Sequence, residues 1–315
     1  MPSLLSHLQR DSQDFYGLTF EDNYEMPPNE RLEAACRAAG AGDIEAVREW
    51  LASADDVNAL NVLEPPFGVA GSYNRNSTVL GSCTAKISET IPYEDVDYEA
   101  KTSRLASLKV EIVRLLLESG ADPNLGLVSE YSYSTPLLNA MLGCCYLMEG
   151  CWDPVAHILD MAVLLLDAGA RVNTRNEANE YTGIYDTPLG CALSSLEPES
   201  PHSIKFVSIL LQAGASLDDC GGNVYAEEVY SAEHQVTRRE PWHECKALIA
   251  GVRAAGSWKA FDRVPRKAVI RLRSLYTRGR ATTADPIMKF ICELGDNGIV
   301  WNVLSFWRGE RARLY

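Results

Sequence analysis

A recurring phrase constrains the fold of this chain more than any other feature of its sequence. The clearest copy, Lys109–Asn124, reads KVEIVRLLLESGADPN, and its apolar residues recur at the spacing of one helix face. Gly120 stands where a helix needs a left-handed residue to stop, and Pro123 prevents a restart. The phrase therefore predicts a helix with a fixed end.

The same phrase returns elsewhere in the chain, each time with apolar residues before a stop. Its copies are MAVLLLDAGARVN (Met161–Asn173), FVSILLQAGASLD (Phe206–Asp218) and the fainter AVREWLASADDVN (Ala46–Asn58). A second signal opens on threonine at Thr78-Val79-Leu80, Thr135-Pro136-Leu137 and Thr187-Pro188-Leu189. Threonine caps a helix, and proline at the first helical position needs no amide partner. Together the two signals predict repeated units of two helices.

A unit of this kind resembles the ankyrin repeat, and the chain is identified as a member of the ankyrin-repeat proteins. The resemblance implies an all-α ankyrin-repeat solenoid of helix-turn-helix units with extended hairpin loops and a helical C-terminal cap. Ankyrin units repeat every ~33 residues, so the longer intervals here require insertions in the loops. We expect three parts: an N-terminal arm at residues 1–28, an array of about four clear repeats plus a degenerate one at 29–256, and a basic helical cap at 257–315.

Two units depart from the pattern. In the second, an insertion at Glu89–Arg104 precedes a helix expected at Leu105–Ser119. The insertion, with Tyr93 and Tyr98 among carboxylates, fits an acidic docking loop or a phosphorylation site, and we favour a disordered surface loop because charged insertions cost little. In the degenerate fifth unit, we expect the first helix at Asn223–Tyr230.

The enlarged connections between units are rich in tyrosine with acidic neighbours. Tyrosine offers a large contact area at low entropic cost together with a hydroxyl group, which makes it frequent in binding surfaces. We therefore predict a partner-binding surface at these hairpin tips, formed by Tyr73, Glu130, Tyr131, Tyr133, Glu177, Glu180, Tyr181 and Tyr185. The alternative is that the tyrosine rings pack between adjacent hairpins and only stiffen them.

Charge is unevenly spread along the chain, whose net value is −14. Residues 253–315 contain 13 Lys+Arg and 5 Asp+Glu, so residues 1–252 hold the remaining 16 and 38. This division fits ordinary solvated faces, but it also fits an array that attracts a basic segment of a partner, or a tail that folds back onto the array. A balance of +8 beside −22, without a stacking motif, makes nucleic acid an unexpected partner.

Signatures of catalysis and metal binding are missing from the sequence. It contains no G-x-x-x-x-G-K-[ST] loop, no H-E-x-x-H and no G-x-S-x-G. Cys144 and Cys145 are adjacent, so they leave a helix on different faces, and no C-x2-C pair accompanies them. We expect no enzyme, no cofactor and no metal site.

The C-terminal segment carries its own resemblances. The phrases VRAAGSWKAF, LRSLYTRGRAT and WNVLSFWR resemble the end of ankyrin-repeat proteins predicted from unicellular marine algae. LRSLYTRGRA also resembles a SOCS box, and GIVWNVLSFW the first helix of an F-box, which implies docking to a ubiquitin-ligase scaffold. A third interpretation is a hydrophobic seal on the end of the array, formed by Ile299, Val300, Leu304, Phe306 and Trp307.

These patterns lead to one expected function and one alternative. We expect a non-catalytic scaffold that binds another protein through the hairpin tips and the concave face. The alternative is a substrate-recruiting adaptor of a ubiquitin ligase, docked through its C-terminal helices. No apolar run reaches the ~18–20 residues of a membrane span, and the first residues lack a secretory signal, so we expect an intracellular protein, cytoplasmic or nuclear.

Overall fold

The chain is described from a computed structural model, which is mostly helical. It describes residues 30–63, 75–85, 91, 97–129, 132–145, 152–175, 187–196, 200, 202–220, 222–223, 228–229, 231–237, 242–294, 299–300 and 302. The helices are α2 (Glu30–Ala41), α3 (Ile44–Leu51), α4 (Val79–Cys83), α5 (Tyr98–Glu118), α6 (Pro136–Cys145), α7 (Trp152–Asp167), α8 (Pro188–Ser195), α9 (Ser203–Gln212), α10 (Ala232–Thr237), α11 (His243–Ala255), α12 (Trp258–Phe261), α13 (Val264–Thr277) and α14 (Pro286–Glu293).

Short strands lie in the connections between helix pairs. They are β1 (Asn61–Leu63), β2 (Arg75–Ser77), β3 (Leu127–Ser129), β4 (Ser132–Ser134), β5 (Gly222–Asn223) and β6 (Glu228–Val229). The first four form one antiparallel sheet in chain order, and β5 pairs with β6. The prediction of an all-α chain is therefore confirmed for its bulk, with strands confined to the loops.

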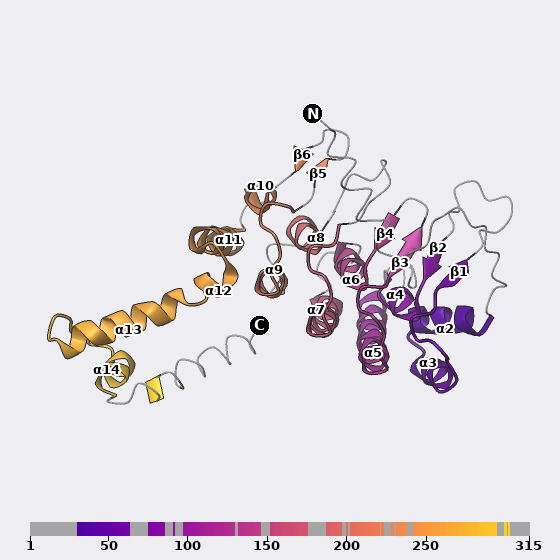
Figure 1. Cartoon of the computed structure of the whole chain (residues 1–315), viewed down its shortest axis with the longest axis horizontal. Helices are drawn as coiled ribbons and strands as arrows, with labels where there is room; N and C mark the ends of the chain where they lie inside the picture. Colours follow the sequence, from indigo (N-terminus) through magenta and orange to yellow (C-terminus); the bar gives the residue numbers. More distant parts are fainter. Residues whose placement is uncertain are drawn as a thin grey trace.

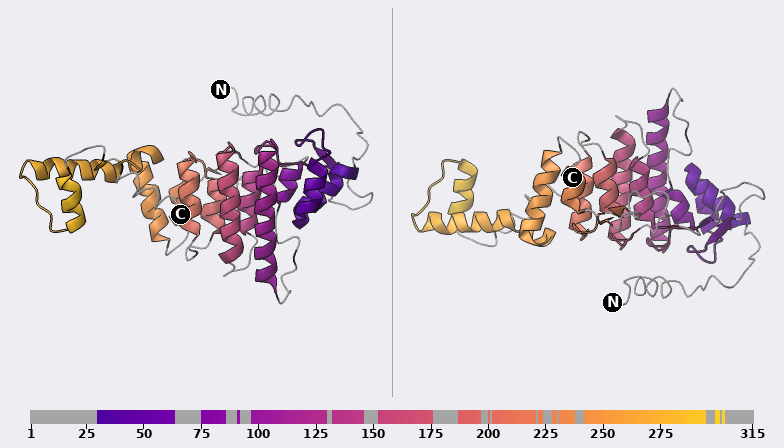
Figure 2. Two further views of the ribbon diagram at one scale, coloured as in Figure 1. Left: turned by 90° about the horizontal axis from the view of Figure 1, so that it is seen from below. Right: turned by 90° about the horizontal axis from the view of Figure 1, so that it is seen from above.

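The helices stack in two parallel rows (Figures 1 and 2). In one row α2, α4, α6, α8 and α10 contact one another in that order, and in the other row α3, α5, α7, α9 and α11 do the same. Each pair buries its apolar sides against the pair before and the pair after, so no single pair has a core of its own. The strands lie along one edge, on the side away from α3, α5, α7 and α9 (Figure 1).

The repeated phrase places its apolar residues at equivalent buried positions in successive helices. In α5, Ile112, Val113 and Leu116 are fully buried, and the residues at the same distance from the helix stop in α7 and α9 are buried as well. These are Met161, Ala162 and Leu165 in α7, and Phe206, Val207 and Leu210 in α9. One continuous core runs from α2 to α11 as a result.

The start and stop signals act as expected. The Thr78 and Thr187 hydroxyls accept from the amides of Gly81 and Gly190, three residues into their helices, at 2.9 and 3.1 Å. After α5, Gly120 adopts φ +90°, a left-handed conformation that favours glycine. The glycines at the same place after α7, α9 and α11 do likewise: Gly169, Gly214 and Gly256.

The expected boundaries of the second and fifth units were wrong. Helix α5 begins at Tyr98 rather than Leu105, so the second half of the insertion is helical and not a disordered loop. Tyr98 is 5% exposed and Thr102 fully buried, which extends the buried stripe of α5 backwards by two turns. In the fifth unit, residues expected to be helical form the β5–β6 hairpin instead, and the short helix is α10.

A buried lysine lies where the first helix of the second unit ends. Lys109, on α5, is 1% exposed and donates from Nζ to the carbonyl oxygen of Ala85 at 3.0 Å. Ala85 follows the C-terminus of α4, where helix carbonyls lose their intrahelical partners. The bond ties the short α4 to α5.

Of the residues predicted to seal the array, Ile299 and Val300 are described, and Leu304, Phe306 and Trp307 lie outside the described residues. Trp258 and Phe261 of α12 pack on the main core, with ring centroids 5.9 Å apart. Helices α13 and α14 instead form a separate small core from Val269, Ile291 and Val300. Val300 therefore does not close the end of the array, because its side chain packs against Val269 and Ile291. Figure 2 shows α13 running away from the stack.

Candidate interaction surfaces

Asparagines tie each unit to the next through backbone groups. The Asn124 side chain donates to the carbonyl oxygen of Gly169 at 3.3 Å and accepts from the amide of Arg171 at 2.8 Å. The Asn58 side chain makes the same pair of hydrogen bonds to the next loop. It donates to the carbonyl oxygen of Gly120 at 3.3 Å and accepts from the amide of Asp122 at 2.7 Å. The Asn173 side chain likewise donates to the carbonyl oxygen of Gly214 at 3.1 Å and accepts from the amide of Ser216 at 2.8 Å. This asparagine ladder fixes the spacing of the loops that carry the hairpins.

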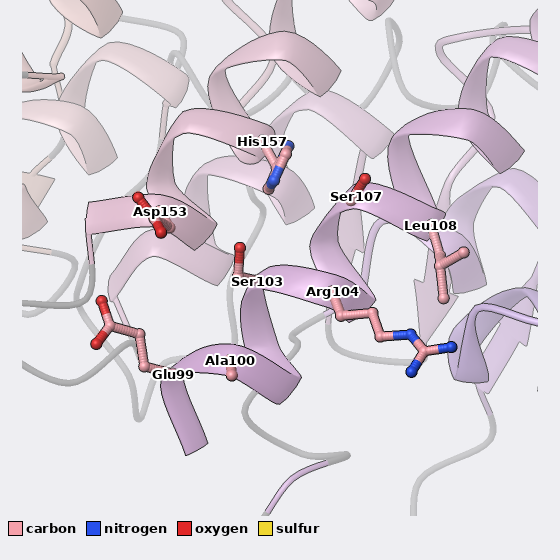
Figure 3. A pocket seen from close by; sticks show the side chains of 8 residues that line it. All are labelled: Glu99, Ala100, Ser103, Arg104, Ser107, Leu108, Asp153 and His157. Carbon is pink, nitrogen blue, oxygen red and sulfur yellow. The ribbon is translucent and has the colours of Figure 1, made fainter. Parts of the chain in front are cut away.

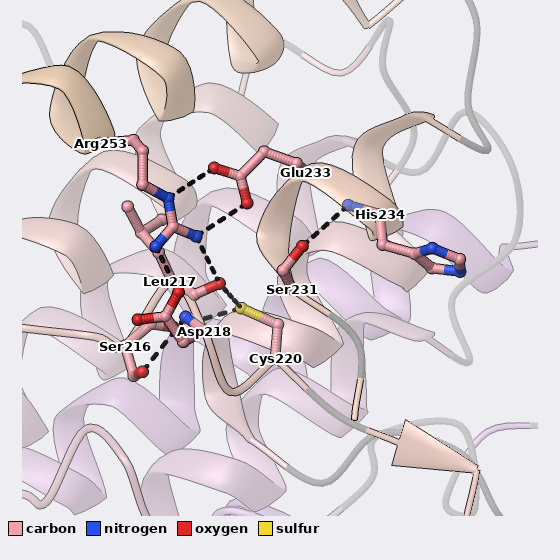
Figure 4. Close-up of polar contacts among 8 residues, drawn as sticks. All are labelled: Ser216, Leu217, Asp218, Cys220, Ser231, Glu233, His234 and Arg253. Carbon is pink, nitrogen blue, oxygen red and sulfur yellow. Dashed lines mark hydrogen bonds and ion pairs between the residues drawn. The ribbon is translucent and has the colours of Figure 1, made fainter. Parts of the chain in front are cut away.

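The ladder ends at Asp218, the residue that replaces asparagine in the fourth copy. A carboxylate has no hydrogen to donate to a glycine carbonyl, so a different contact forms. Asp218 pairs with the Arg253 guanidinium, which also donates to both carboxylate oxygens of Glu233 at 2.8 Å (Figure 4). Arg253 lies on α11, and its hydrogen bonds hold the pKa of Glu233 below its usual value. The last unit is thus joined to its neighbour by an ion-pair cluster.

Two loops of different units share one sheet. Strand β2, from the first connection, pairs antiparallel with β3 of the next, with Arg75 opposite Ser129 and Ser77 opposite Leu127. Ser77 and Ser134 are buried at the base of the sheet. Ser134 donates to the Asn139 side chain of α6 at 2.5 Å, which anchors β4 to the helix that follows. The hairpins are therefore built as one surface, not as independent loops.

One of the predicted binding residues lies among those that the structure describes. Tyr133 belongs to β4 and is paired with Val128 of β3. The other predicted residues lie outside those that the structure describes: Tyr73, Glu130, Tyr131, Glu177, Glu180, Tyr181 and Tyr185. The binding surface at the tips stays a prediction, and so does its alternative, in which the rings pack between hairpins. In the insertion, Tyr98 is buried and Tyr93 lies outside the described residues.

A groove lies between the extended start of α5 and the start of α7. It encloses about 560 Å³ and is lined by Glu99, Ala100, Ser103, Arg104, Ser107, Leu108, Asp153 and His157. In Figure 3, Glu99 and Asp153 gather near Ser103, and the Arg104 guanidinium points away from them. No hydrogen bond joins His157 to Ser103 or Ser107 among these described residues. The groove is an open recess with both polar and apolar lining.

The buried cysteines are poor nucleophiles. Burial raises the pKa of the Cys36 thiol to about 11 and that of the Cys83 thiol to about 12. Burial also raises the pKa values of the Cys220 and Cys245 thiols to about 12. Their thiolates, the reactive forms, are scarce near neutral pH. Within the described ranges, no three His, Cys, Asp or Glu side chains are placed to hold a metal ion.

Comparison with known proteins adds no family. No protein-family model matches the chain, and neither does any curated protein. Within the part of the chain that is described, no helix has both the length and the apolar character to cross a membrane.

Sequence reasoning missed the length of α5 and with it the groove. A signal was present, because Tyr98 and Thr102 precede Leu105 and Lys109 at helical spacing. The Arg253 cluster had no such signal, since its members are separated by up to 35 residues. Only the stacking of α10 and α11 on the preceding loop brings them together.

Proposed function

We propose that this chain is a non-catalytic ankyrin-repeat scaffold that binds another protein through its hairpin tips and concave face. The asparagine ladder is the observation that carries the proposal. Its three links join four successive loops by the same pair of backbone contacts, in register with the threonine caps and the glycine stops. A regular ladder of this kind supports a solenoid of equivalent units rather than a globule of unrelated helices.

The position of the strands supports the choice of binding surface. Pairing of β2 with β3 joins neighbouring hairpins into one sheet, and this supports the proposal that the hairpins act together in binding a partner. The tips carry tyrosines beside glutamates, and the stacked part of the chain is strongly acidic. We infer that the partner presents a basic segment, which would approach an acidic surface faster and with a strong dependence on salt.

Capture experiments with the full chain test this function. The wild-type chain, immobilised, is compared with a tip variant carrying Tyr131→Ser, Tyr133→Ser, Tyr181→Ser and Tyr185→Ser, and with a matched outer-face variant carrying Glu111→Lys. The proposal expects a protein retained by wild type and by the outer-face variant and lost from the tip variant. Retention by the tip variant, with its folding shown intact by circular dichroism, would contradict it.

Charge reversal at Glu130, Glu177 and Glu180 tests the chemistry of the partner. Replacing these glutamates by lysine is expected to weaken capture at low salt, with a smaller effect at 0.5 M NaCl because salt screens exposed charges. Equal weakening at both salt concentrations would contradict a basic partner and leave shape as the cause.

A second candidate function, the ubiquitin-ligase adaptor, is favoured by one observation. Helices α13 and α14 carry exposed apolar side chains and do not close the array. An adaptor would bind substrate through the array and a ligase component through these helices. Loss of a ligase component from capture, with other partners retained when residues 265–315 are deleted, would support it. No ligase component among the captured proteins would reject it.

A further inference from the structure

The groove between α5 and α7 is lined by hydrogen-bonding side chains that the protein itself leaves unused. Ser103 and Ser107 of α5 and His157 of α7 are half-buried and line the same recess. Among the described residues, none of these three side chains has a hydrogen-bond partner. Figure 3 shows the Ser103 hydroxyl pointing towards the side on which Asp153 and His157 lie. Three polar groups therefore converge on one recess without a partner from the chain.

Serines at the end of α5 and within α9 behave differently. The hydroxyls of Ser119 and Ser208 donate to the carbonyl oxygens four residues earlier, at 2.8 and 2.7 Å. This bond is the usual one for a serine in a helix. In the same described part of the chain, Ser103 and Ser107 make no such bond. Their hydroxyls are consequently available to a group that enters the groove.

The spacing of the two hydroxyls matches that of an extended peptide. Ser103 and Ser107 are four residues apart on α5, so at about 1.5 Å per residue they are separated by about 6 Å along the helix axis. An extended chain presents backbone groups of the same orientation every two residues, or about 6.7 Å. A peptide lying along α5 can thus bond to both hydroxyls with successive groups. A helical partner cannot, because the backbone groups of a helix are bonded internally.

The groove limits the length of its occupant. Its volume of about 560 Å³ lies within the range of small-ligand sites, about 300–1,000 Å³. Its lining on α5 runs from Glu99 to Leu108, which is about 14 Å of helix. About four residues of extended chain span that length. The exposed Ala100, with its small side chain, leaves room for the backbone of such a segment to approach α5.

Charge selects among extended segments. Glu99 and Asp153 are each the second residue of their helix, and Figure 3 shows both carboxylates at the same end of the groove. Both residues are exposed, and neither has an ion-pair partner among those described. The Arg104 guanidinium points away from this end. A cationic side chain of the occupant is attracted by two carboxylates there, whereas an anionic one is repelled.

We propose that this groove docks a short extended segment of a second protein, about four residues long, that carries a lysine or an arginine. Its backbone bonds to Ser103, Ser107 and His157, and its cationic side chain pairs with Glu99 and Asp153. The groove belongs to the row of α5 and α7, and the strands lie on the side away from that row (Figure 1). It is a second docking site, separate from the hairpin tips, and it does not depend on their function.

Fluorescence polarisation with the full chain tests the role of the peptide backbone. The probe is a capped, fluorescein-labelled peptide, Ala-Lys-Ala-Lys-Ala-Ala. A matched control peptide has the same side chains and the same charge, with N-methyl groups on its four central amides. The control is expected to bind at least about fivefold more weakly, because it cannot donate backbone hydrogen bonds. Equal binding of the two peptides overturns the proposal, since attraction by charge alone does not depend on amides.

Removal of the hydroxyls tests the site itself. Ser103→Ala with Ser107→Ala should weaken binding of the probe at least about fivefold and leave binding of the N-methylated control unchanged. Alanine favours a helix more than serine does, so α5 keeps its fold, and a thermal melt checks this. Binding of the probe by this variant with wild-type affinity overturns the proposal.

Removal of the carboxylates tests the charge of the occupant. Glu99→Gln with Asp153→Asn should weaken binding of the probe about tenfold or more at low salt. The matched control, Glu111→Gln with Glu118→Gln, removes two charges from exposed positions elsewhere on α5 and should stay within about twofold of wild type. Equal weakening by both variants would assign the binding to the overall acidity of the array and overturn the proposal.

Further arms separate other occupants and the hairpin tips. The variant Tyr131→Ser with Tyr133→Ser should bind the probe as wild type does, so failure of this site and failure of the tip function are distinguishable. Loss of probe binding in that variant overturns a separate site. Displacement of the probe by spermine as effectively as by the unlabelled peptide would assign the groove to a free polyamine. Probe binding only after removal of residues 303–315 would assign it to the chain's own end, and either result overturns the proposal.

Discussion

The Asn124 side chain donates a hydrogen bond to the carbonyl oxygen of Gly169, 3.3 Å away, although 45 residues separate them. Gly169 holds a left-handed φ of +94° that turns its carbonyl towards the preceding loop. One contact thus couples a helix stop in one unit to the loop of the unit before it. Stability of a stacked array depends on such nearest-neighbour contacts, since each unit touches only the next.

Asn124→Ala should lower the free energy of unfolding by about 1–3 kcal/mol, because it removes the two hydrogen bonds to the next loop, each worth about 0.5–1.5 kcal/mol. Asn124→Asp should also destabilise the fold, since a carboxylate cannot donate to the carbonyl oxygen of Gly169. Urea unfolding followed by circular dichroism measures both effects. Glu111→Gln, on an exposed face of α5, is the control and should change stability by less than about 0.5 kcal/mol. An Asn124→Ala chain as stable as this control would show that the ladder is dispensable.

Gly190→Ala should destabilise the chain and Gly40→Ala should not, although both glycines are helical. A Cβ atom at Gly190 would stand 2.0 Å from the carbonyl oxygen of Cys220, a contact that the backbone must relieve by moving. We expect a loss of roughly 1–3 kcal/mol or more. At Gly40 the nearest atom would be 3.8 Å away, so alanine should be neutral or stabilise α2 by up to about 1 kcal/mol. Similar thermal melts for the two variants would contradict the close approach of α8 to the following loop.

Arg253→Met should weaken the last unit in a pH-dependent way. The arginine is more than a third exposed, so solvent screening limits the loss to about 1 kcal/mol at neutral pH. The pKa of Glu233 is held below its usual 4.5 in the folded chain, so its contribution is complete above that pH and disappears as pH falls through the lowered value. The difference between wild type and variant should therefore be constant from pH 7 to about pH 5.5 and shrink below pH 4.5. Urea unfolding at several pH values across this range measures the stability difference between wild type and Arg253→Met. A difference that grows as the pH falls would contradict the prediction.

Lys109 offers a test of a buried cation. Lys109→Ala removes a core side chain and leaves the carbonyl oxygen of Ala85 without this donor, so it should cost about 2–5 kcal/mol. Lys109→Met keeps most of the volume and loses only the polar contacts, so its unfolding midpoint should fall between those of wild type and the alanine variant. Equal stability of the alanine variant and wild type would show that the contact to Ala85 contributes nothing.

Four of the six buried thiols among the described residues should resist alkylation in the folded chain. At pH 8, iodoacetamide should leave Cys36, Cys83, Cys220 and Cys245 unmodified, because burial blocks access and raises their pKa values to about 11–12. The same thiols should react in urea. Mass spectrometry of digested protein locates each adduct. Rapid labelling of Cys83, the most enclosed of them, would indicate that α4 opens readily from α5.

Much of the fold could be predicted from local patterns. The spacing of Ile112, Val113 and Leu116 ahead of Gly120 indicated a buried helix face and its end, and the structure buries all three. Thr78 and Thr187 indicated helix starts and do cap them. The candidate site was less accessible to such reasoning. Tyrosine-rich loops marked possible tips, but of the predicted tip residues only Tyr133 lies among the described residues. Val300, predicted to help seal the array, packs with Val269 and Ile291 instead.

The amino-acid sequence by itself determined the helix starts at Thr78 and Thr187 and the stops at Gly120, Gly169 and Gly214. These depend on periodicity, caps and left-handed glycines, all of which act within a few residues. The tertiary structure decided three other features. Helix α5 begins at Tyr98, and an ion pair between Arg253 and Asp218 takes the place of the asparagine contact. Val300 packs with Val269 instead of with the array. Each of those outcomes depends on which surfaces meet across long stretches of chain, and a choice between alternative apolar partners is made by packing, not by the pattern of either segment alone.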